Sequence, residues 1–319
     1  MKDHYGRKIN YMRLSITDLC NLRCVYCMPE EGVEKHAHTK NLSFEEMLDL
    51  IKAGVALGID KVRLTGGEPL VRHGIVDLVR EIGRIPEIKD LTMTTNGILL
   101  PKYAKELKKA GLTRVNISLD TFDPDKYHQI TRWGHIEDVL AGIEAAKEVG
   151  MHPIKINTVL IKGFNDDEIG SFVNFTKDHE VDIRFIELMP LGESISFAEN
   201  KYLSNDEVLR QVPELQPVVE LDKSGPAIYY RLPGAKGKVG LINPISKHFC
   251  KECNRIRVTS DGKIKPCLHS DFEIDIVALR KEGKSYEEIL KQAIGEKPEQ
   301  HHIDENEKQL LRNMNEIGG

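Results

Sequence analysis

The chain has 319 residues, of which 40% are hydrophobic and 30% are charged, and its formal net charge is −5. These values are typical of a globular protein with one large α/β domain, or with one such domain and a smaller one. Without a long basic run we expect no nucleic-acid partner, and no apolar run approaches the roughly 18 residues of a membrane span. The N-terminus lacks the apolar core of a signal peptide, so we expect a cytoplasmic protein.

Short β-type runs alternate with helical patterns up to about residue 189. The predicted strands cover 11–17, 61–65, 90–95, 113–119, 154–161 and 181–188. A capping box, Ser43-Phe44-Glu45-Glu46, begins the first predicted helix, and further helices are predicted over 74–83, 102–110, 136–149 and 166–179. Six β–α repeats predict a parallel sheet covered by helices, either doubly wound or curled into part of a barrel.

Alternation along the strands favours the barrel. One strand face is apolar, and the other is polar, with Arg13, Ser15, Thr17, Arg63, Thr65, Thr92, Thr94, Asn96, Asn116, Ser118, Asp120, Lys155 and Asn157. A closed eight-stranded barrel fills its interior with apolar layers. We therefore predict an incomplete (β/α)6 TIM-like barrel whose lumen holds a charged ligand. The sixth predicted strand mixes polar and apolar residues, so which of its two faces points into the lumen is left open.

The pattern changes after Pro190. Gly- and Pro-punctuated β-type segments follow, with further capping boxes at Ser204-Asn205-Asp206-Glu207 and Ser285-Tyr286-Glu287-Glu288. We predict two domains, a barrel over residues 1–190 and a smaller α+β domain over residues 191–319 that covers the barrel mouth.

The first three cysteines follow the first strand with the spacing C-x3-C-x2-C, at Cys20, Cys24 and Cys27. In a protein that is not exported, this spacing indicates a metal site before disulfides. Three thiolates leave one metal corner free, which is typical of catalytic rather than structural centres. A zinc knuckle completed by His36 or His38 is the alternative.

The other three cysteines, Cys250, Cys253 and Cys267, form a second group. A structural zinc site with His248 or His269 as fourth ligand is one interpretation. Arg255 and Arg257 lie just beyond Cys253 and share one face of an extended segment, which favours an anionic ligand nearby.

Three further motifs end predicted strands. Gly66, Gly67 and Glu68 belong to a Thr-Gly-Gly-Glu-Pro turn in which the glycines let a ligand approach the backbone, and Glu68 could accept a hydrogen bond from an amine. The others are 94–97 and 118–120. The alternative is that all three are ordinary turns and caps.

No P-loop sequence is present, so a phosphorylated substrate would need separate cations. The candidates are Arg13, Arg63, Lys155, Arg255 and Arg257, although any one of them could instead form a surface ion pair. The terminal Gly318-Gly319 is either a frayed end or a slim tail that threads into a cavity.

The three-cysteine spacing with Tyr26 before its last cysteine, together with the Gly-Gly-Glu-Pro turn, resembles the radical S-adenosylmethionine (SAM) superfamily. The stretches 13–18, 184–187 and 250–257 and the terminal Gly-Gly extend the likeness, from about Gly6 to Gly319, to the GTP 3′,8-cyclase family. That resemblance implies two [4Fe–4S] clusters held by the two cysteine groups, with SAM bound to the first. It implies conversion of GTP to (8S)-3′,8-cyclo-7,8-dihydroguanosine 5′-triphosphate, the first step of molybdenum cofactor biosynthesis.

The resemblance also implies roles for individual residues. The residues implied to contact SAM are Tyr26, Gly66, Gly67, Glu68, Ser118 and Met189. Those implied to bind GTP are Arg13, Arg63, Thr94, Lys155, Arg255 and Arg257. Those implied to act in catalysis are Arg13, Lys155, Arg255, Arg257, Gly318 and Gly319. The implied partners are an electron donor such as flavodoxin or ferredoxin and a downstream cyclic pyranopterin monophosphate synthase, and a homodimer is left open.

Two other functions compete with this interpretation. The nearer one is a radical SAM enzyme that modifies peptides and carries an auxiliary cluster, although such enzymes usually have more C-terminal cysteines. The other is a zinc-binding adaptor without enzymatic activity.

Overall fold

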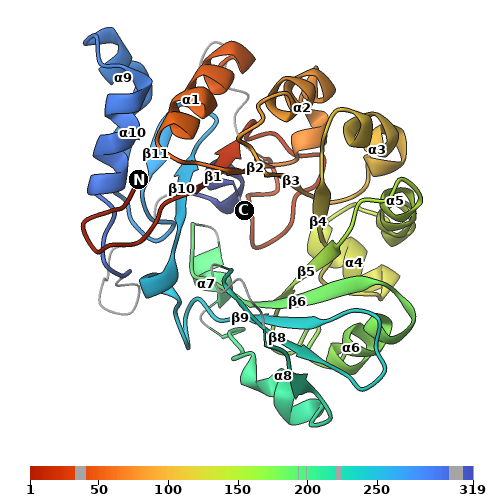
Figure 1. Ribbon diagram of the computed structural model, residues 1–319. Helices are drawn as coiled ribbons and strands as arrows, with labels where there is room; N and C mark the ends of the chain where they lie inside the picture. The colour runs from red at the N-terminus through yellow and green to blue at the C-terminus, as the bar shows by residue number, and fades with distance from the viewer. Residues whose placement is uncertain (33–40, 193, 199, 220–224, 302–311, 319) are drawn as a thin grey trace.

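Six parallel strands follow one another around a curved sheet in the order of the sequence (Figure 1). They are β1 (Tyr11–Ser15), β2 (Lys61–Thr65), β3 (Asp90–Thr95), β4 (Arg114–Ser118), β5 (Ile154–Leu160) and β6 (Val181–Glu187). The computed structural model describes residues 1–319 except 33–40, 193, 199, 220–224, 302–311 and 319. All six predicted strands are confirmed, because their alternating apolar residues are local signals that the final fold retains.

Helices cover the outer side of this sheet (Figure 1). They are α1 (Phe44–Ala56), α2 (Ile75–Gly83), α3 (Leu100–Lys109), α4 (Pro124–Thr131), α5 (Ile136–Glu148) and α6 (Ile169–Asp178). The apolar strand face packs beneath them in one core, in which Leu14, Val62, Met93 and Val115 are completely buried. Burial of this face leaves the polar face toward the lumen, as the alternation predicts. Helix α4 was not predicted.

The C-terminal part of the chain adds strands to both edges of the same sheet. Its strands are β7 (Gln216–Pro217), β8 (Ala227–Arg231), β9 (Val239–Ile242), β10 (Arg255–Val258), β11 (Lys263–Lys265) and β12 (Ile274–Asp275). Strand β10 pairs in parallel with β1, and β9 pairs in parallel with β6. The sheet ends at β12 and β7 without closing, so the incomplete barrel is confirmed. The boundary at residue 190 stays a prediction, but the two parts share one sheet.

Short helices complete the C-terminal part. They are α7 (Ser194–Ala198), α8 (Asp206–Gln211), α9 (Ile276–Lys281), α10 (Tyr286–Gly295) and α11 (Met314–Ile317). Helix α10 lies beside α1 (Figure 1). None of the helices in the described ranges is both long and apolar enough to cross a membrane.

Two of the three predicted capping boxes are formed. Ser43 and Ser285 each cap a helix with reciprocal hydrogen bonds to the glutamate three residues on. The prediction at Ser204 is wrong: Asn205 is the N-cap of α8, and Glu207 pairs with Arg210 and Gln211 within the helix. A nearby cation competes successfully for this carboxylate because Arg210 stands one turn further along the same face.

Candidate active site

The first cysteine group lies in the loop after β1. Cys20, Cys24 and Cys27 are half-buried free thiols. The Leu22 N–H is 3.4 Å from Cys20 Sγ, and the Cys27 N–H donates to the Cys24 carbonyl at 2.9 Å. The loop therefore brings its three sulfur atoms to the carboxyl end of the parallel strands, where active sites of such barrels form.

The electrostatics of this loop disfavour three free thiolates. Burial raises the pKa of Cys20 to about 11 and the pKa of Cys27 to about 12. Burial, and then the neighbouring Cys27 and Cys20, raise the pKa of Cys24 well above its usual range. Thiolate is the form that binds metal, and bound iron supplies the positive charge that this environment lacks. The donor set thus fits an iron–sulfur cluster held through three cysteines.

No three His, Cys, Asp or Glu side chains within the described ranges are arranged to hold one metal ion. His36 and His38, the alternative zinc ligands, lie outside the described residues.

The Gly-Gly-Glu-Pro turn packs directly against the first cysteine loop. A Cβ at Gly67 would stand 2.3 Å from the Leu19 carbonyl oxygen, and the Gly67 N–H donates to the Thr17 carbonyl at 2.7 Å. Glycine is needed at this position because the chain itself fills the space that a Cβ would take. The predicted approach of a ligand to this backbone stays a prediction.

Glu68 is buried within this turn. Its carboxylate accepts hydrogen bonds from the Thr95 hydroxyl at 2.8 Å and from the N–H groups of Asn96 and Leu70 at 2.7 and 3.0 Å. Burial raises the pKa of Glu68 to about 7. Three of its roughly four acceptor positions are occupied by the protein, which leaves about one for a ligand amine.

A second carboxylate connects the cysteine loop to the strand ends. The Tyr26 hydroxyl donates to Oδ2 of Asp120, whose Oδ1 accepts the Val159 N–H at 2.8 Å. Burial raises the pKa of Asp120 to about 6. Ser118, at the end of β4, lies two residues before this aspartate. Tyr26 and Ser118 are thereby brought to the same end of the sheet as the sulfur atoms.

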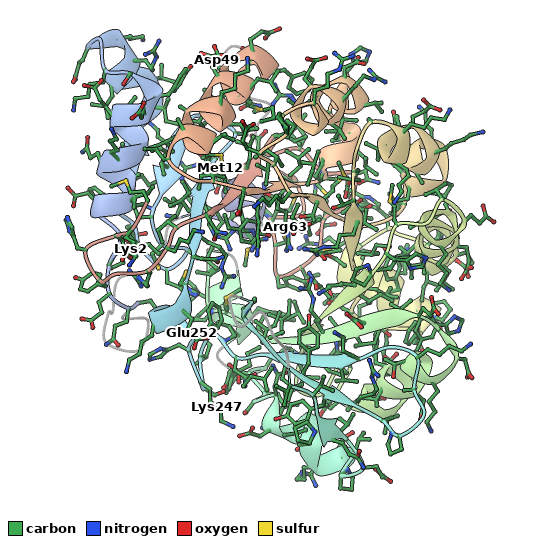
Figure 2. The ribbon with its side chains drawn as sticks, in the orientation of Figure 1. Lys2, Met12, Asp49, Arg63, Lys247 and Glu252 are labelled. Carbon is green, nitrogen blue, oxygen red and sulfur yellow. The ribbon has the colours of Figure 1, made fainter. Side chains whose placement is uncertain are left out.

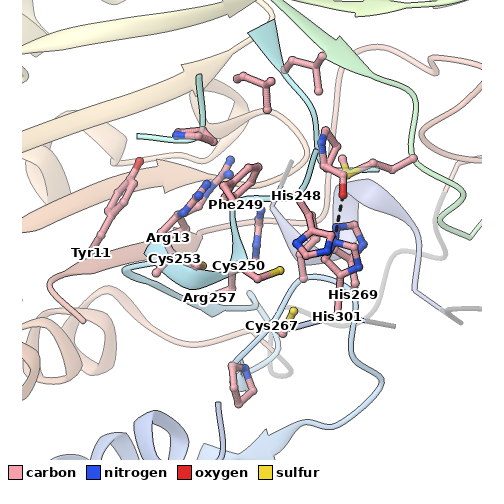
Figure 3. Close-up of a pocket in the computed structure, with 18 of the residues that line it drawn as sticks. Tyr11, Arg13, His248, Phe249, Cys250, Cys253, Arg257, Cys267, His269 and His301 are labelled. Atoms are coloured by element: carbon pink, nitrogen blue, oxygen red, sulfur yellow. Dashed lines mark hydrogen bonds between the residues drawn. The ribbon is translucent and has the colours of Figure 1, made fainter. Parts of the chain in front are cut away.

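The second cysteine group lines a pocket in the lumen. Figure 3 shows Cys250, Cys253 and Cys267 between the arginines on one side and His248, His269 and His301 on the other. Burial alone would raise the pKa of Cys253, but Arg255 and Lys297 lower it to about 6. This sulfur is therefore held in the thiolate form that a cluster requires. His248 and His269, the alternative zinc ligands, lie beside the three cysteines on the pocket wall.

Arginines from separate strands form one row on the pocket wall. Arg257 of β10, Arg13 of β1 and Arg63 of β2 are direct register partners. Burial, and then Arg257 and Arg63, depress the pKa of Arg13 well below its usual range. Burial also lowers the pKa of Arg63 and that of Arg257 to about 10. In the view of Figure 2, Arg63 is labelled near the centre of the molecule.

The described wall of this pocket carries several cationic side chains and no carboxylate. Arg255 and Arg184 also line it, and no Asp or Glu is among the described residues on its wall. Buried cations of one sign that lower each other's pKa are costly unless an anion binds between them. The geometry therefore suits a ligand with several negative charges.

Two predicted ligand contacts stand beside this pocket instead of on its wall. Lys155 donates to the Tyr229 hydroxyl at 3.0 Å, and its Nζ is 3.9 Å from Asp182 Oδ2. Thr94 and Lys155 are both register partners of Asn116, so they share the polar face. Met189 lines the pocket. The roles assigned to these residues stay predictions.

Sequence reasoning missed several pocket residues. Arg184 donates to Asn157 Oδ1 at 2.6 Å, and the two are register partners on β6 and β5. The mixed pattern of β6 concealed Arg184, although Asn157 had already been placed on the polar face. Tyr11 shares the parity of Arg13, and its ring lies under the Arg63 guanidinium, 5.4 Å from it. That parity was the available signal.

The C-terminal tail enters the lumen. Arg257 Nη1 donates to the Gly318 carbonyl at 2.6 Å. Gly318 has φ 71°, and a Cβ there would stand 2.3 Å from Thr65 Oγ1, so both conformation and space require glycine. Gly319 lies outside the described residues.

Comparisons with known proteins agree with this geometry. The model of the radical SAM superfamily matches residues 14–176, and the model described as Molybdenum Cofactor Synthesis C matches residues 181–303. The protein named GTP 3′,8-cyclase from Alkaliphilus oremlandii is 56% identical over the whole of both chains. The protein of the same name from Peptoclostridium acidaminophilum is 55% identical over 99% of this chain and 98% of its own.

The chain belongs to the GTP 3′,8-cyclase family of the radical SAM superfamily. Membership implies that it uses SAM and [4Fe–4S] clusters, and the two cysteine groups fit that requirement. Solved structures extend the likeness at the level of the fold. Streptococcus suis SuiB bound to its precursor peptide SuiA has a TM-score of 0.61 at 16% identity, covering 82% of this chain and 60% of SuiB. The protein anSMEcpe has a TM-score of 0.60 at 14% identity, covering 91% and 81%.

Proposed function

We propose that this protein is a GTP 3′,8-cyclase, a lyase that converts GTP to (8S)-3′,8-cyclo-7,8-dihydroguanosine 5′-triphosphate at the start of molybdenum cofactor biosynthesis. The observation that carries the proposal is the row of Arg257, Arg13 and Arg63 on the wall of the pocket that the second cysteine group lines. A triphosphate offers several negative charges to this row, and guanidinium groups pair well with phosphate oxygens. The names of the full-length relatives supply the nucleotide.

The reaction needs two sites in the lumen, one for SAM at the first cysteine group and one for GTP at the second. When bound, the first cluster and SAM supply the chemistry that removes one hydrogen atom from ribose C3′. Tyr26, Gly66, Gly67, Glu68, Ser118 and Met189 are proposed to hold SAM. Arg13, Arg63, Thr94, Lys155, Arg255 and Arg257 are proposed to hold GTP, with guanine toward the second cysteine group.

The atom balance fixes what the protein must do. A C3′–C8 bond forms as the hydrogen leaves, and one electron and one proton then complete the reduction, so the product is an isomer of GTP. The residues of the lumen hold ribose and base at bonding distance and exclude water from the radical. Gly318 lies in the part of the tail that enters this lumen, which supports its proposed part in catalysis. The same part is proposed for Gly319, which lies outside the described residues, from the resemblance alone.

A peptide-modifying enzyme is the runner-up. The structural likeness to SuiB extends only to the fold, because the two sequences are 16% identical. A buried arginine row without an Asp or Glu among the described pocket residues suits a polyphosphate better than a peptide backbone.

The test is anaerobic incubation of cluster-loaded protein with SAM, a reductant and GTP deuterated at C3′. We expect deuterium in 5′-deoxyadenosine and a guanine-derived isomer of GTP that separates from it by chromatography. SAM cleavage that is indifferent to GTP, or that requires a peptide, would contradict the proposal.

The remaining partners follow from this reaction. We propose that a low-potential donor such as flavodoxin or ferredoxin supplies the electrons, and that a cyclic pyranopterin monophosphate synthase takes the product. Assembly as a homodimer and a cytoplasmic address stay predictions.

A further inference from the structure

The described part of the C-terminal tail, residues 312–318, contacts the first cysteine group and the strand that follows the second. Asn315 Nδ2 donates to the Asp18 carbonyl at 3.1 Å, and the Asn315 backbone N–H donates to the Cys27 thiol. Three residues further on, Gly318 accepts its hydrogen bond from Arg257. The tail therefore connects the loop of the first cysteine group to the strand that follows the second.

Within the tail, Asn313 and Glu316 form a capping box at the start of helix α11, which is the local support for this segment. Helix α11 has four residues, which is too short to be stable without tertiary contacts. Ile317 is buried and anchors the tail near its C-terminal end. At the N-terminal end of the tail, ion pairs provide the anchor.

Arg312 provides these contacts at the point where the tail begins. Its Nη1 and Nη2 are 3.3 and 2.9 Å from the two carboxylate oxygens of Asp261. Its Nε and Nη2 are 2.7 and 2.8 Å from the two carboxylate oxygens of Glu273. One planar guanidinium thus makes two bidentate pairs, an arrangement that fixes its direction as well as its distance. The Arg312 side chain is 23% exposed, so water screens these pairs only in part.

The carboxylates belong to the strands that build the pocket. Asp261 lies in the turn between β10 and β11, and Glu273 lies just before β12. Strand β10 carries Arg255 and Arg257, so the ion pairs tie the tail to the same sheet edge as the pocket arginines. Arg312 itself is not among the residues that line the pocket.

We propose that Arg312 is a positioning residue whose pairs with Asp261 and Glu273 seat the tail, so that Asn315 reaches Cys27 and Gly318 reaches Arg257. The pairs are made outside the lumen but decide what occupies it. This inference rests on the proposed function only for the effect of the seated tail on turnover.

The experiment measures hydrogen exchange of the 312–318 segment in cluster-loaded protein, alongside product formation. Arg312→Ala is compared with the wild type, with Arg312→Lys and with Arg84→Ala. Arg84 is a matched control because it makes an exposed ion pair with Glu81 on α2. We expect Arg312→Ala to exchange this segment roughly tenfold faster or more, with unchanged iron content. Arg312→Lys should be intermediate, since an ammonium keeps the charge without the planar fork.

Product formation should fall with the exchange protection. We expect kcat for GTP conversion to decrease about tenfold in Arg312→Ala, with KM for GTP within about twofold of the wild type, because positioning and not binding is lost. Unchanged exchange of 312–318, or full turnover with a freely exchanging tail, would overturn the proposal. If Arg312→Ala exchanges faster throughout the chain, Asp261→Asn and Arg312→Lys carry the test. If the wild type makes no nucleotide product, the exchange result still decides whether Arg312 holds the 312–318 segment in place.

Discussion

The two cysteine groups have the same number of thiols but differ in the charges that surround them. Cys20, Cys24 and Cys27 lie near buried carboxylates, and burial raises the pKa of each thiol. In the second group burial likewise raises the pKa of Cys250, but Arg255 and Lys297 lower the pKa of Cys253 to about 6. The first group thus depends on bound iron to carry its thiolates, while the protein already stabilises a thiolate in the second. The difference follows from position. Cations of the pocket proposed to bind the triphosphate also lie beside the Cys253 sulfur and lower its pKa.

The largest effect should come from removing a ligand of the first group. In Cys24→Ala we expect SAM cleavage and GTP conversion to disappear and iron content to fall to about half, because one of two clusters is lost. Cys253→Ala should retain the first cluster and SAM binding but form no cyclised nucleotide. Iron analysis and assay of 5′-deoxyadenosine check both variants. SAM cleavage at the wild-type rate in Cys24→Ala would show that the first cysteine group does not hold the cluster needed for SAM cleavage.

The next effect concerns the arginine row. Arg63→Met should weaken GTP binding roughly 30-fold or more, about 2 kcal/mol, because a buried charged hydrogen bond to phosphate is lost. The free energy of unfolding of the nucleotide-free protein should not fall, since the other arginines lose a repelling neighbour. Calorimetric titration under anaerobic conditions measures the first quantity and denaturant unfolding the second. Arg84→Met is the matched control, and equal GTP affinity in both variants would remove Arg63 from the site.

A pH experiment on cluster-free protein compares the two groups directly. With a pKa of about 6, Cys253 is a thiolate at pH 7.5, whereas Cys20, with a pKa of about 11, is a thiol. We expect alkylation of Cys253 to be at least about tenfold faster at pH 7.5 and to slow as the pH falls through 6. Mass spectrometry of the modified peptides measures both rates.

The sign of the linked stability effect follows from the same shift. Because folding lowers the pKa of Cys253 from 9.0, its contribution is fully present above pH 9 and is lost as the pH falls through about 6. Arg255→Gln should slow the alkylation of Cys253 at pH 7.5. Equal rates for Cys20 and Cys253 would show that the cations do not act on this sulfur.

The smallest predicted effect is the loss of a helix N-cap, and it should be equal in the barrel and in the C-terminal part of the chain. Ser43→Ala and Ser285→Ala each remove a formed capping box, and each should lower the free energy of unfolding by about 1 kcal/mol with kcat unchanged. Ser204→Ala should cost less, because no capping box forms there. Denaturant unfolding of the three variants gives the comparison. A larger loss in Ser204→Ala than in the other two would mean that the caps are not what hold these helix ends.

Much of the barrel could be predicted because its signals are local. Each strand from β1 to β6 has its own period-2 pattern, and Arg13, Arg63 and Lys155 could be placed on the polar face by parity alone. Helix α4 was missed although Asp123 and Pro124 form a typical helix start, with the Asp123 side chain accepting the N–H groups of Asp125 and Lys126. The signal was present in the sequence and was not used.

By itself the sequence determined the strands, the polar lumen face, the two cysteine groups and the family to which they point. Only the tertiary structure decided that β10 lies beside β1, which makes Arg257 a direct neighbour of Arg13. It also decided that Arg312 meets Asp261 and Glu273 and that Gly318 meets Arg257. The physical reason is that side-chain alternation is set by each strand's own backbone. The pairing of segments far apart in the chain depends on which edges and charges remain unsatisfied once the local elements have formed.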